Sequence, residues 1–537
     1  MRDSTSESGE TAHPTHLYFG SVSSNPPYAP WLDADVCTRA LGARDARFDG
    51  VFYVGITTTR VYCRPVCPAR VSYPSHRRFF PSAASAERAG FRPCMRCRPE
   101  LAPGRALIDA IPRLARVAAH KIGAGALNGR GVAELARELG VSERHLRRVM
   151  EHAIGVSPVE LAQTHRLLLA KQLLADTGLS ITRIAYASGF QSLRRFNTVF
   201  RERYRMSPTA MRRTPKAVAT RAANGRSSAA TAVPELVRLT LGYRAPLAWD
   251  TLLAMFQHES VPGVTVVHAG SYSRTVALEG KTGVVTVENP RALSDTPRAA
   301  RNHLNVRVSP SLLPVLMPLL ARLRQLFDLD AEPAAIDAHL TQGGLGSLVT
   351  QRRGLRVPGV LDGFEVILLA LLGHVSRGRL AANARIRRVV SALGPSVDTG
   401  FPSLTRLMPS AARVAEAGAA RLTALGVPQR RAYALTAVAS AVAEGRLRLE
   451  PGADVVATRR AIMSFDGIGD RLATTIVTRA LYWPDAFPSS DRSLQRSAEC
   501  LTAKQLSSRA DRWRPWRAYA ALHLWLHDAA EGNGTTR

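Results

Sequence analysis

Two close pairs of cysteines constrain this chain of 537 residues more than any other feature. Cys63 and Cys67 form a Cys-x3-Cys pair, and after twenty-six intervening residues Cys94 and Cys97 form a Cys-x2-Cys pair. Two close pairs joined by a loop are the ligand pattern of a closed tetrahedral site, in which four thiolates hold one zinc ion. The sequence therefore predicts one Zn2+ site, and a zinc ribbon that only folds its domain would show the same spacing.

The charge of the chain favours DNA as its partner. Lysine and arginine number 72 against 42 acidic residues, which gives a formal net charge of +30. Such a charge attracts a polyanion, although a solvated basic surface without a partner would give the same composition. Arginines are dense around the four cysteines, at Arg60, Arg64, Arg70, Arg77, Arg78, Arg92, Arg96 and Arg98.

The remaining composition indicates the compartment. Cys37 and Cys500 are too few for a disulfide framework, so we expect a reducing compartment and two ordinary buried cysteines. Residues 1–30 are rich in Ser, Thr, Pro and Gly without an apolar run. We expect them to form a disordered tail, neither a signal peptide nor a membrane anchor. The expected location is the bacterial cytoplasm, in association with the nucleoid and without a membrane partner.

Hydrophobic periodicity predicts a multidomain α+β chain. Short strand patterns lead into the first cysteine pair, helical periodicity follows, and beyond an unpatterned stretch the chain alternates as strands before it becomes helical again. The expected parts are a small four-cysteine zinc domain at 31–104, an all-α double helix-turn-helix domain at 105–213, a linker at 214–233, an α+β domain at 234–320 and an all-α helix-hairpin-helix domain at 321–531.

Three motifs surround the cysteines: Arg47–Gly50, Thr57–Pro65 and Ala89–Cys94. With them, the segment resembles the N-terminal domain of the Ada DNA-repair regulators. In that family the first cysteine of the set, here Cys63, accepts a methyl group from a methylphosphotriester in the DNA backbone. Zinc holds a bound thiol as the thiolate, which is the form that attacks. The resemblance therefore implies that Cys63 is both a metal ligand and a catalytic nucleophile.

Two helix-turn-helix patterns follow. In the first, Gly140 makes the turn and Ser142 caps the next helix; the second runs from Ser180 to Phe190, before a helix that begins near Ser192. The stretch resembles an AraC-type DNA-binding domain, also in Gly155–Pro158. Arginine and asparagine on such helices suit base edges and phosphates alike. The expected DNA-binding side chains are Arg144, Arg147, Arg148, Arg194, Arg195 and Asn197.

The second half begins with strand patterns. We expect a helix near 249–256 and strands near 239–241, 265–267, 275–278, 284–287 and 304–308. From Leu312 onward the pattern is almost wholly helical. There Phe465–Asp470 joins two helical runs, and the backbone amides of such a Gly-x-Gly hairpin, at Gly467 and Gly469, can hold a DNA phosphate.

An acidic residue, Asp491, closes a loop twenty-two residues after Gly469. Together with Arg353–Gly359 and Ala521–Trp525, these features resemble the AlkA-type helix-hairpin-helix DNA glycosylases, whose fold begins with an α+β N-terminal domain. The resemblance implies that Asp491 is the catalytic carboxylate, which stabilises an oxocarbenium-like sugar, and that Trp525 is a wall of the base pocket. An ordinary helix cap is the alternative role for Asp491.

The chain departs from the AlkA pattern at two places. Arg471 and Thr475 stand where aromatic residues are common in that family, and an arginine that points into the pocket would repel a cationic base. The loop that wedges into the duplex, at Gly373–Ser376, is one residue shorter. Both departures leave open whether this half of the chain releases bases.

We interpret the chain as a protein with three functions: a methyl acceptor for phosphotriesters, an AraC-like transcriptional regulator and an AlkA-like glycosylase for 3-methyladenine and 7-methylguanine. Its expected partners are double-stranded DNA, both damaged and promoter DNA, and RNA polymerase. One alternative is a methylation-sensing transcription factor whose C-terminal half binds DNA without base excision. Another is an architectural DNA-binding protein with an inert zinc site. No Pro-Cys-His-Arg segment occurs, so a guanine O6-alkyl transferase has no visible nucleophile.

Overall fold

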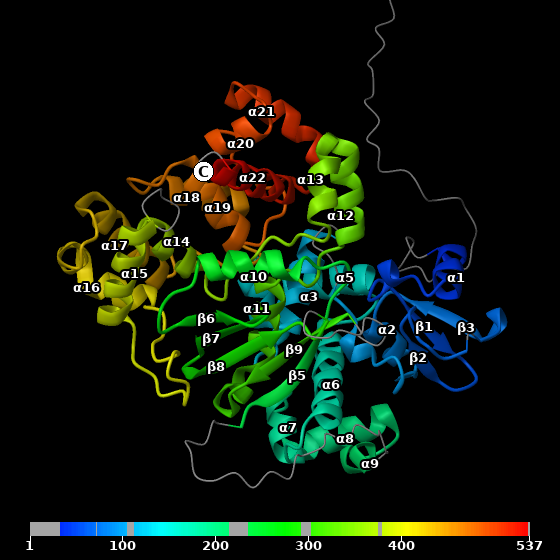
Figure 1. Ribbon diagram of the computed structural model, residues 1–537. Helices are drawn as coiled ribbons and strands as arrows, with labels where there is room; N and C mark the ends of the chain where they lie inside the picture. The colour runs from blue at the N-terminus through cyan, green and yellow to red at the C-terminus, as the bar shows by residue number, and fades with distance from the viewer. Residues whose placement is uncertain are drawn as a thin grey trace, which may run out of the picture.

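The computed structural model describes residues 33–70, 72–104, 112–213, 235–291, 302–373 and 379–534. The expected tail at 1–30 and the expected linker at 214–233 lie outside them. Figure 1 shows the zinc domain in blue on one side, a sheet in the centre, and C-terminal helices above the sheet and on the other side. Within the described part of the chain, no helix combines the length and the apolar composition that crossing a membrane requires.

The zinc domain is built on a four-stranded sheet with the strand order β3-β1-β2-β4. Its elements are α1 (Ala34–Gly42), β1 (Tyr53–Ile56), β2 (Val61–Cys63), β3 (Arg77–Phe80), α2 (Ala83–Arg88) and β4 (Arg92–Pro93). Strand β2 pairs with β1 antiparallel and with β4 parallel. Since Cys63 ends β2 and Cys94 directly follows β4, this pairing brings the two cysteine pairs together.

The next part is all-helical, and both expected helix-turn-helix units are present. Its helices are α3 (Arg113–Gly123), α4 (Val132–Glu138), α5 (Glu143–Ile154), α6 (Pro158–Asp176), α7 (Ile181–Ala187), α8 (Leu193–Tyr204) and α9 (Pro208–Arg213). Gly140 has a φ of 70°, which permits the turn between α4 and α5. Ser142 and Ser192 cap α5 and α8 through side-chain oxygens that accept backbone N–H groups. The cap at Ser142 and the start of a helix near Ser192 agree with the sequence-based expectations.

The strand-rich part forms a five-stranded antiparallel sheet with the order β5-β9-β8-β7-β6. Its elements are β5 (Val237–Gly242), α10 (Trp249–His258), β6 (Thr265–His268), β7 (Ser271–Leu278), β8 (Lys281–Glu288) and β9 (His303–Val308). All five expected strands and the expected helix are present. β7 and β8 begin earlier than their apolar patterns indicate, because the two strands pair along their whole length, polar ends included.

The second helix-turn-helix unit shares a hydrophobic core with this sheet. Leu167 of α6 and Phe196 of α8 belong to the same buried cluster as Leu239 and Val285 of the sheet. The Nε2 atom of Gln172 also donates to the carbonyl oxygen of Thr240 at 2.7 Å. The helix-turn-helix domain is therefore packed against the sheet and does not stand apart from it.

The remaining chain is helical, as expected from Leu312 onward. Its helices are α11 (Leu316–Leu326), α12 (Pro333–Leu340), α13 (Gly346–Gln351), α14 (Gly363–Leu371), α15 (Arg379–Leu393), α16 (Ala411–Ala424), α17 (Gln429–Ala443), α18 (Val455–Met463), α19 (Asp470–Ala480), α20 (Arg492–Ser497), α21 (Ala503–Ala510) and α22 (Arg517–Gly534). Helix α11 belongs to the core of the central sheet. Two further buried clusters hold the other helices together, one around α14, α17 and α19 and the other around α12, α20 and α22.

One buried guanidinium joins the zinc domain to the rest of the molecule. Arg244 is 4% exposed. Its Nη1 atom donates to the carbonyl oxygens of Gly104 and Asp330, at 2.8 and 3.0 Å, and its Nη2 atom donates to that of Asp49 at 3.0 Å. The Asp330 carboxylate in turn accepts the N–H of Gly104 at 3.0 Å. Three segments far apart in the sequence therefore share one set of hydrogen bonds.

Replacing Arg244 with methionine should weaken this junction. The variant Arg244→Met leaves the three carbonyl groups without their donor, and each buried group left unsatisfied costs about 1–3 kcal/mol. We expect the apparent midpoint of thermal unfolding, followed by circular dichroism, to fall by roughly 5 °C or more. The matched control is Arg446→Met, because Arg446 is exposed and pairs with Glu444 at the surface. Equal midpoints for the two variants would contradict the role assigned to Arg244.

Candidate functional site

The four cysteines meet at the edge of the zinc-domain sheet. Their Sγ atoms all lie within 4.8 Å of one another. None of the four residues is more than 8% exposed. Cys63 is held by the pairing of β2, whereas Cys67, Cys94 and Cys97 lie in the turns that follow β2 and β4.

This donor set fits one zinc ion. Zinc–thiolate bonds of about 2.3 Å in a tetrahedron place the sulfur atoms about 3.8 Å apart, which agrees with the observed cluster. The backbone N–H of Arg64 donates to Cys97 Sγ at 3.4 Å, and that of Arg96 donates to Cys94 Sγ at 3.3 Å. Such hydrogen bonds stabilise thiolates that carry negative charge and orient them toward a metal. Cys63, Cys67, Cys94 and Cys97 thus form a site for one Zn2+.

Arg64 stabilises the metal site through hydrogen bonds of its side chain. Its Nε atom donates to Asp49 Oδ1 at 2.7 Å, and its Nη1 atom donates to the carbonyl oxygen of Cys97 at 3.0 Å. The guanidinium therefore ties the turn after β2 to the turn after β4. The sequence indicated Arg64 only as one of many arginines near the cysteines, and its position next to Cys63 was the only local signal of this role.

A buried carboxyl group connects the metal site to the helix-turn-helix domain. The hydroxyl group of Tyr62, the residue before Cys63, donates to Glu87 Oε1 at 3.1 Å. Thr164 of α6 donates to Glu87 Oε2 at 2.9 Å, and Arg203 of α8 lies 3.8 Å from the same oxygen. Burial raises the pKa of Glu87 to about 7, although Arg203, Thr164 and Tyr62 oppose this shift. The strand that ends in Cys63 is therefore in contact with α6 and α8 through one side chain.

The predicted DNA-binding side chains of α5 and α8 lie on the surface. Arg144, Arg147, Arg148, Arg194 and Arg195 are exposed, and Asn197 is half-buried. Arg147 pairs with Glu143 on its own helix at 2.6 Å. Both helices are anchored by fully buried residues, Leu146 in α5 and Phe196 in α8. The two helices thus present basic faces on rigid supports, and their contacts with DNA stay a prediction.

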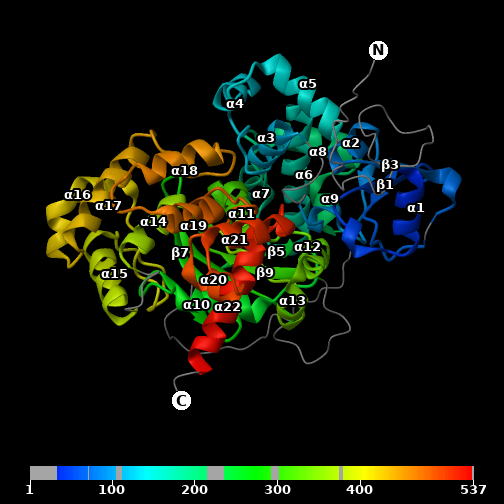
Figure 2. The ribbon, with the colours of Figure 1, turned by 90° about the horizontal axis from the view of Figure 1, so that it is seen from above.

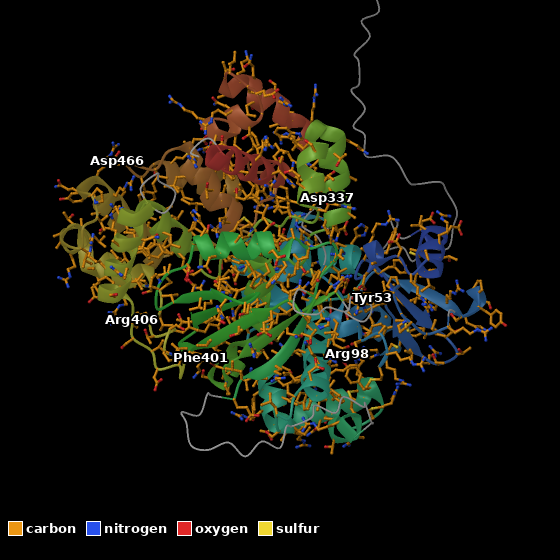
Figure 3. All side chains as sticks on the ribbon, viewed as in Figure 1. Tyr53, Arg98, Asp337, Phe401, Arg406 and Asp466 are labelled. Atoms are coloured by element: carbon orange, nitrogen blue, oxygen red, sulfur yellow. The ribbon has the colours of Figure 1, made fainter. Side chains whose placement is uncertain are left out.

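The predicted hairpin joins α18 to α19. Gly467 has a φ of 82°, which favours glycine, and Gly469 is the N-cap residue of α19. A groove at this place is lined by Arg430, Arg431 and residues 463–469. The Nη2 atom of Arg430 lies 2.8 Å from Asp466 Oδ1, and this hydrogen bond lowers the pKa of Asp466. Basic side chains and a helix N-terminus therefore face the same groove, with Asp466 at the outer edge of the molecule (Figure 3).

The predicted catalytic acid is buried at the start of α20. Asp491 is 2% exposed and is the N-cap residue of this helix. Its Oδ1 atom accepts the N–H groups of Ser493 and Leu494, at 2.8 and 3.3 Å, and the hydroxyl group of Ser493 at 2.5 Å. Both roles that the sequence left open for Asp491 are therefore compatible with its position, because one carboxylate oxygen caps the helix and the other faces away.

Arg471 pairs with that second oxygen. The Nε atom of Arg471 lies 2.6 Å from Asp491 Oδ2, and the arginine side chain is 50% exposed whereas the carboxylate is fully buried. Arg471 belongs to the first turn of α19, two residues after Gly469. The structure thus places this arginine, which replaces an aromatic residue of the AlkA pattern, directly against the predicted catalytic acid.

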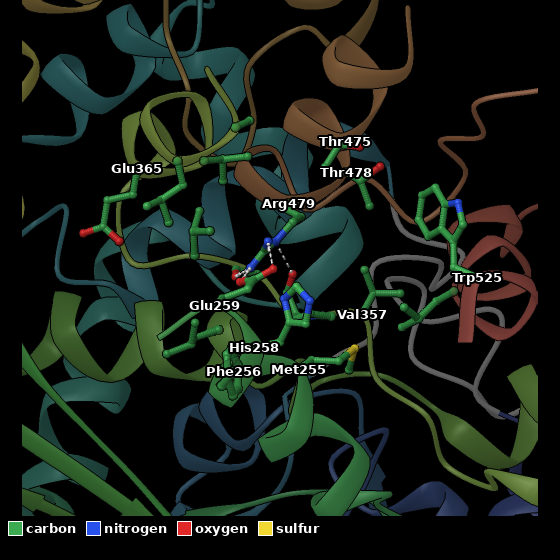
Figure 4. A pocket seen from close by; sticks show the side chains of 18 of the residues that line it. Met255, Phe256, His258, Glu259, Val357, Glu365, Thr475, Thr478, Arg479 and Trp525 are labelled. Atoms are coloured by element: carbon green, nitrogen blue, oxygen red, sulfur yellow. Dashed lines mark hydrogen bonds and ion pairs between the residues drawn. The ribbon is translucent and has the colours of Figure 1, made fainter. Parts of the chain in front are cut away.

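A cavity of about 430 Å³ lies beside this pair, between α10 and the C-terminal helices. Trp525 lines it together with Arg471, Thr475 and apolar side chains such as Met255 (Figure 4), and its role as a wall of a base pocket stays a prediction. An ion pair that the sequence did not indicate, between Arg479 Nη1 and Glu259 Oε1 at 2.6 Å, also lines it. These charges offset each other, so the cavity combines a mostly apolar wall with few available polar groups.

Some sequence-based expectations fall outside the described residues or differ from the structure. In the shortened wedge loop, residues 374–378 lie outside the described residues. Cys37 is buried as expected, but Cys500 is only half-buried, because it lies in the short connection between α20 and α21. The zinc domain, represented by Tyr53, and the hairpin, represented by Asp466, occupy opposite sides of the molecule (Figures 2 and 3). The predicted residues thus form separate sites and not one active centre.

Comparisons with known proteins identify three of the parts. Family models match the metal binding domain of Ada at residues 36–100, a helix-turn-helix domain at 135–214 and the AlkA N-terminal domain at 238–362. The first match contains all four cysteines, and the second contains both recognition helices α5 and α8. The third match continues beyond residue 320, through α11 and α12, into the helical part.

Curated relatives cover the same parts singly and together. The chain is 36% identical over 502 residues to the probable bifunctional transcriptional activator/DNA repair enzyme AlkA of Mycobacterium tuberculosis, which covers 92% of this chain and 96% of that protein. DNA-3-methyladenine glycosylase 2 of Escherichia coli is 34% identical over 286 residues, 53% of this chain and 96% of that protein. The bifunctional transcriptional activator/DNA repair enzyme Ada of Escherichia coli is 31% identical over 163 residues, 30% of this chain and 44% of that protein. The chain therefore belongs to the family of bifunctional transcriptional activators and DNA repair enzymes that join an Ada-type metal-binding domain, a helix-turn-helix domain and an AlkA-type glycosylase domain.

Proposed function

We propose that this protein repairs alkylated DNA and regulates the response to it through three sites. Cys63 takes a methyl group from DNA methylphosphotriesters, α5 and α8 bind promoter DNA, and the helical domain releases alkylated purines. The observation that supports this most strongly is the occurrence of a four-cysteine site, two exposed basic recognition helices and a buried acid beside a cavity in one chain. Double-stranded DNA is the partner of all three sites, which locates the protein at the nucleoid, and RNA polymerase is the partner of the regulatory function.

The methyl transfer is a displacement at carbon. A bound zinc ion supplies a stable thiolate at Cys63 at neutral pH. The Cys63 sulfur attacks the methyl carbon of the phosphotriester, an S–C bond forms, and the C–O bond breaks to leave a phosphodiester anion. Arg60 and Arg96 are exposed near the cysteines and attract the DNA backbone. The resulting thioether carries no charge, so the methylated domain repels phosphates less than the unmethylated one.

We expect Cys63 to be the single cysteine that is methylated. It follows Val61 and Tyr62 as the acceptor does in the Ada family, whereas the other three cysteines complete the cage. Peptide mass mapping after incubation with methylated DNA should show one added methyl group on Cys63 and none in Cys63→Ser. Cys37→Ser is the control, because Cys37 is a buried cysteine outside the metal cluster. Methylation of Cys94 or Cys97 instead would contradict this assignment.

Sequence-specific DNA binding should depend on the recognition helices. We expect binding to depend on Arg144, Arg148, Arg195 and Asn197, each tested by its alanine variant. Loss of a side chain that reads a base should cost about 1–3 kcal/mol at one position of the operator. Loss of a phosphate-contacting arginine should weaken binding to all sequences alike and reduce its salt dependence. Fluorescence anisotropy over a salt series separates the two patterns. If all four variants bind operator and random DNA as the wild type does, the recognition surface lies elsewhere.

Base release in the helical domain follows from the position of Asp491. An alkylated purine that leaves the duplex stack enters the cavity and stacks on Trp525. The bond from C1′ to the base nitrogen breaks, the base leaves with the bonding electrons, and water adds to C1′ and releases a proton to the solvent. The Asp491 carboxylate stabilises the positive charge that develops on the sugar, because burial and the hydrogen bonds to its Oδ1 atom hold it in a fixed position. The hairpin at Gly467 and Gly469 holds the DNA backbone.

Asp491→Asn should abolish base release and leave duplex binding nearly unchanged. Asparagine caps a helix about as well as aspartate, so the fold of α20 is retained while the charge is lost. We expect the single-turnover rate on DNA containing 7-methylguanine to fall about a thousandfold or more. Asp33→Asn, a change at the N-cap of α1 in the zinc domain, is the matched control and should release bases at the wild-type rate.

The alternative, a methylation sensor whose C-terminal half only binds DNA, makes a different prediction in the same assay. Wild type and Asp491→Asn would then both bind the duplex and release no base. The contact between Arg471 and Asp491 supports this alternative if it persists while DNA is bound, because the carboxylate is then covered. Base release by the wild type under the conditions of duplex binding would exclude it.

A further inference from the structure

The contact between Arg471 and Asp491 places a cation where the reaction needs the carboxylate. Three donors occupy Oδ1 of Asp491, from Ser493 and Leu494, so Oδ2 is the oxygen that remains for a substrate. Arg471 Nε covers this oxygen at 2.6 Å, and the carboxylate has no exposed surface. Asp491 is also not among the residues that line the cavity, whereas Arg471 is. Arg471 therefore lies between Asp491 and the cavity.

Arg471 is able to move away from this position. Its side chain is 50% exposed. It lies on the same face of α19 as Thr475 and Thr478, which also line the cavity, so a displaced guanidinium has open space beside it. The hairpin that is expected to hold a DNA phosphate ends two residues before it. A bound phosphodiester thus offers the displaced guanidinium a new anionic partner.

Displacement has different consequences for different bases. A buried carboxylate without a counter-charge is unfavourable, so the carboxylate of Asp491 favours a cation beside it. A nucleotide whose base already carries a positive charge replaces the charge of Arg471 as soon as it enters. A neutral nucleotide replaces it only in the transition state, when positive charge develops on the sugar. Exchange of one cation for another therefore favours bases that are cationic before the bond breaks.

We propose that Arg471 is a specificity-determining residue, an exchangeable counter-cation of Asp491 that makes base release selective for cationic purines over neutral ones. This inference rests on the proposed glycosylase function of the same site. Charge exchange discriminates between bases without stacking, which suits a pocket where Arg471 and Thr475 stand in place of two aromatic side chains. An arginine that points into the pocket is expected to repel a cationic base. While Arg471 is paired with Asp491, the carboxylate neutralises the arginine's charge and this repulsion is absent.

The test compares two duplexes that differ in the charge of one base. One contains 7-methylguanine, which is cationic, and the other contains hypoxanthine, which is neutral. The full-length wild type is compared with the variants Arg471→Gln and Arg471→Lys. For each duplex, the single-turnover rate constant of base release is measured from the abasic sites that form. Melting temperature and zinc content confirm that each variant is folded. Arg446→Gln, the loss of an exposed arginine that pairs with Glu444, is the control.

Arg471→Gln should lower the ratio of the rate on 7-methylguanine to the rate on hypoxanthine about tenfold, because solvent screens a half-exposed pair. Arg471→Lys retains the exchangeable charge and should keep the ratio within about threefold of wild type. An unchanged or increased ratio in Arg471→Gln would overturn the inference while base release itself persists. If the wild type binds both duplexes and releases neither base, the glycosylase function fails, and this inference fails with it.

Discussion

The buried guanidinium of Arg244 is the contact on which the arrangement of the domains depends. The charge is almost inaccessible to water, so its hydrogen bonds come from within the protein: Nη1 and Nη2 donate to three carbonyl oxygens, which belong to segments far apart in the sequence. A second buried guanidinium, Arg356, donates to the carbonyl oxygen of Arg244 at 2.6 Å and to that of Asp328 at 3.1 Å. The Asp328 carboxylate accepts the hydroxyl group of Tyr519 of α22 at 2.6 Å. A continuous chain of hydrogen bonds thus runs from the zinc domain to the last helix of the molecule.

Further contacts join the modules of the protein to one another. The helix-turn-helix domain shares its core with the central sheet, and its first helix reaches the glycosylase part as well, where Arg113 donates to the carbonyl oxygen of Ala453 at 3.1 Å. The zinc domain and the hairpin between α18 and α19 lie on opposite sides of the molecule (Figure 2).

The sequence predicted local features better than contacts between distant segments. The cysteine spacing, the cap at Ser142, the start of a helix near Ser192, and the strands of the central sheet follow from short-range rules, and the structure contains all of them. The Arg471–Asp491 and Arg479–Glu259 pairs join residues that no periodicity relates. Their formation depends on how α19 packs against α20 and α10, which a pattern of apolar residues does not specify. The resemblance to a known family identified Asp491 and Trp525 as candidate site residues. Their neighbours in space became visible only in the packed structure.

The two roles considered for Asp491 are consequences of one geometry. A helix N-cap is a position where backbone amides donate hydrogen bonds to a side-chain oxygen, and Asp491 occupies this position in α20. The same amides fix one oxygen and leave the other in a defined direction, which is what a group must offer if it is to stabilise a developing sugar cation. The second oxygen takes no part in the cap, since Ser493 and Leu494 complete it through Oδ1, and Arg471 supplies its counter-charge. The pair of this oxygen and Arg471 lies next to the cavity that Arg471 lines, so the geometry suits a cap and a catalytic acid alike, and both roles stay predictions.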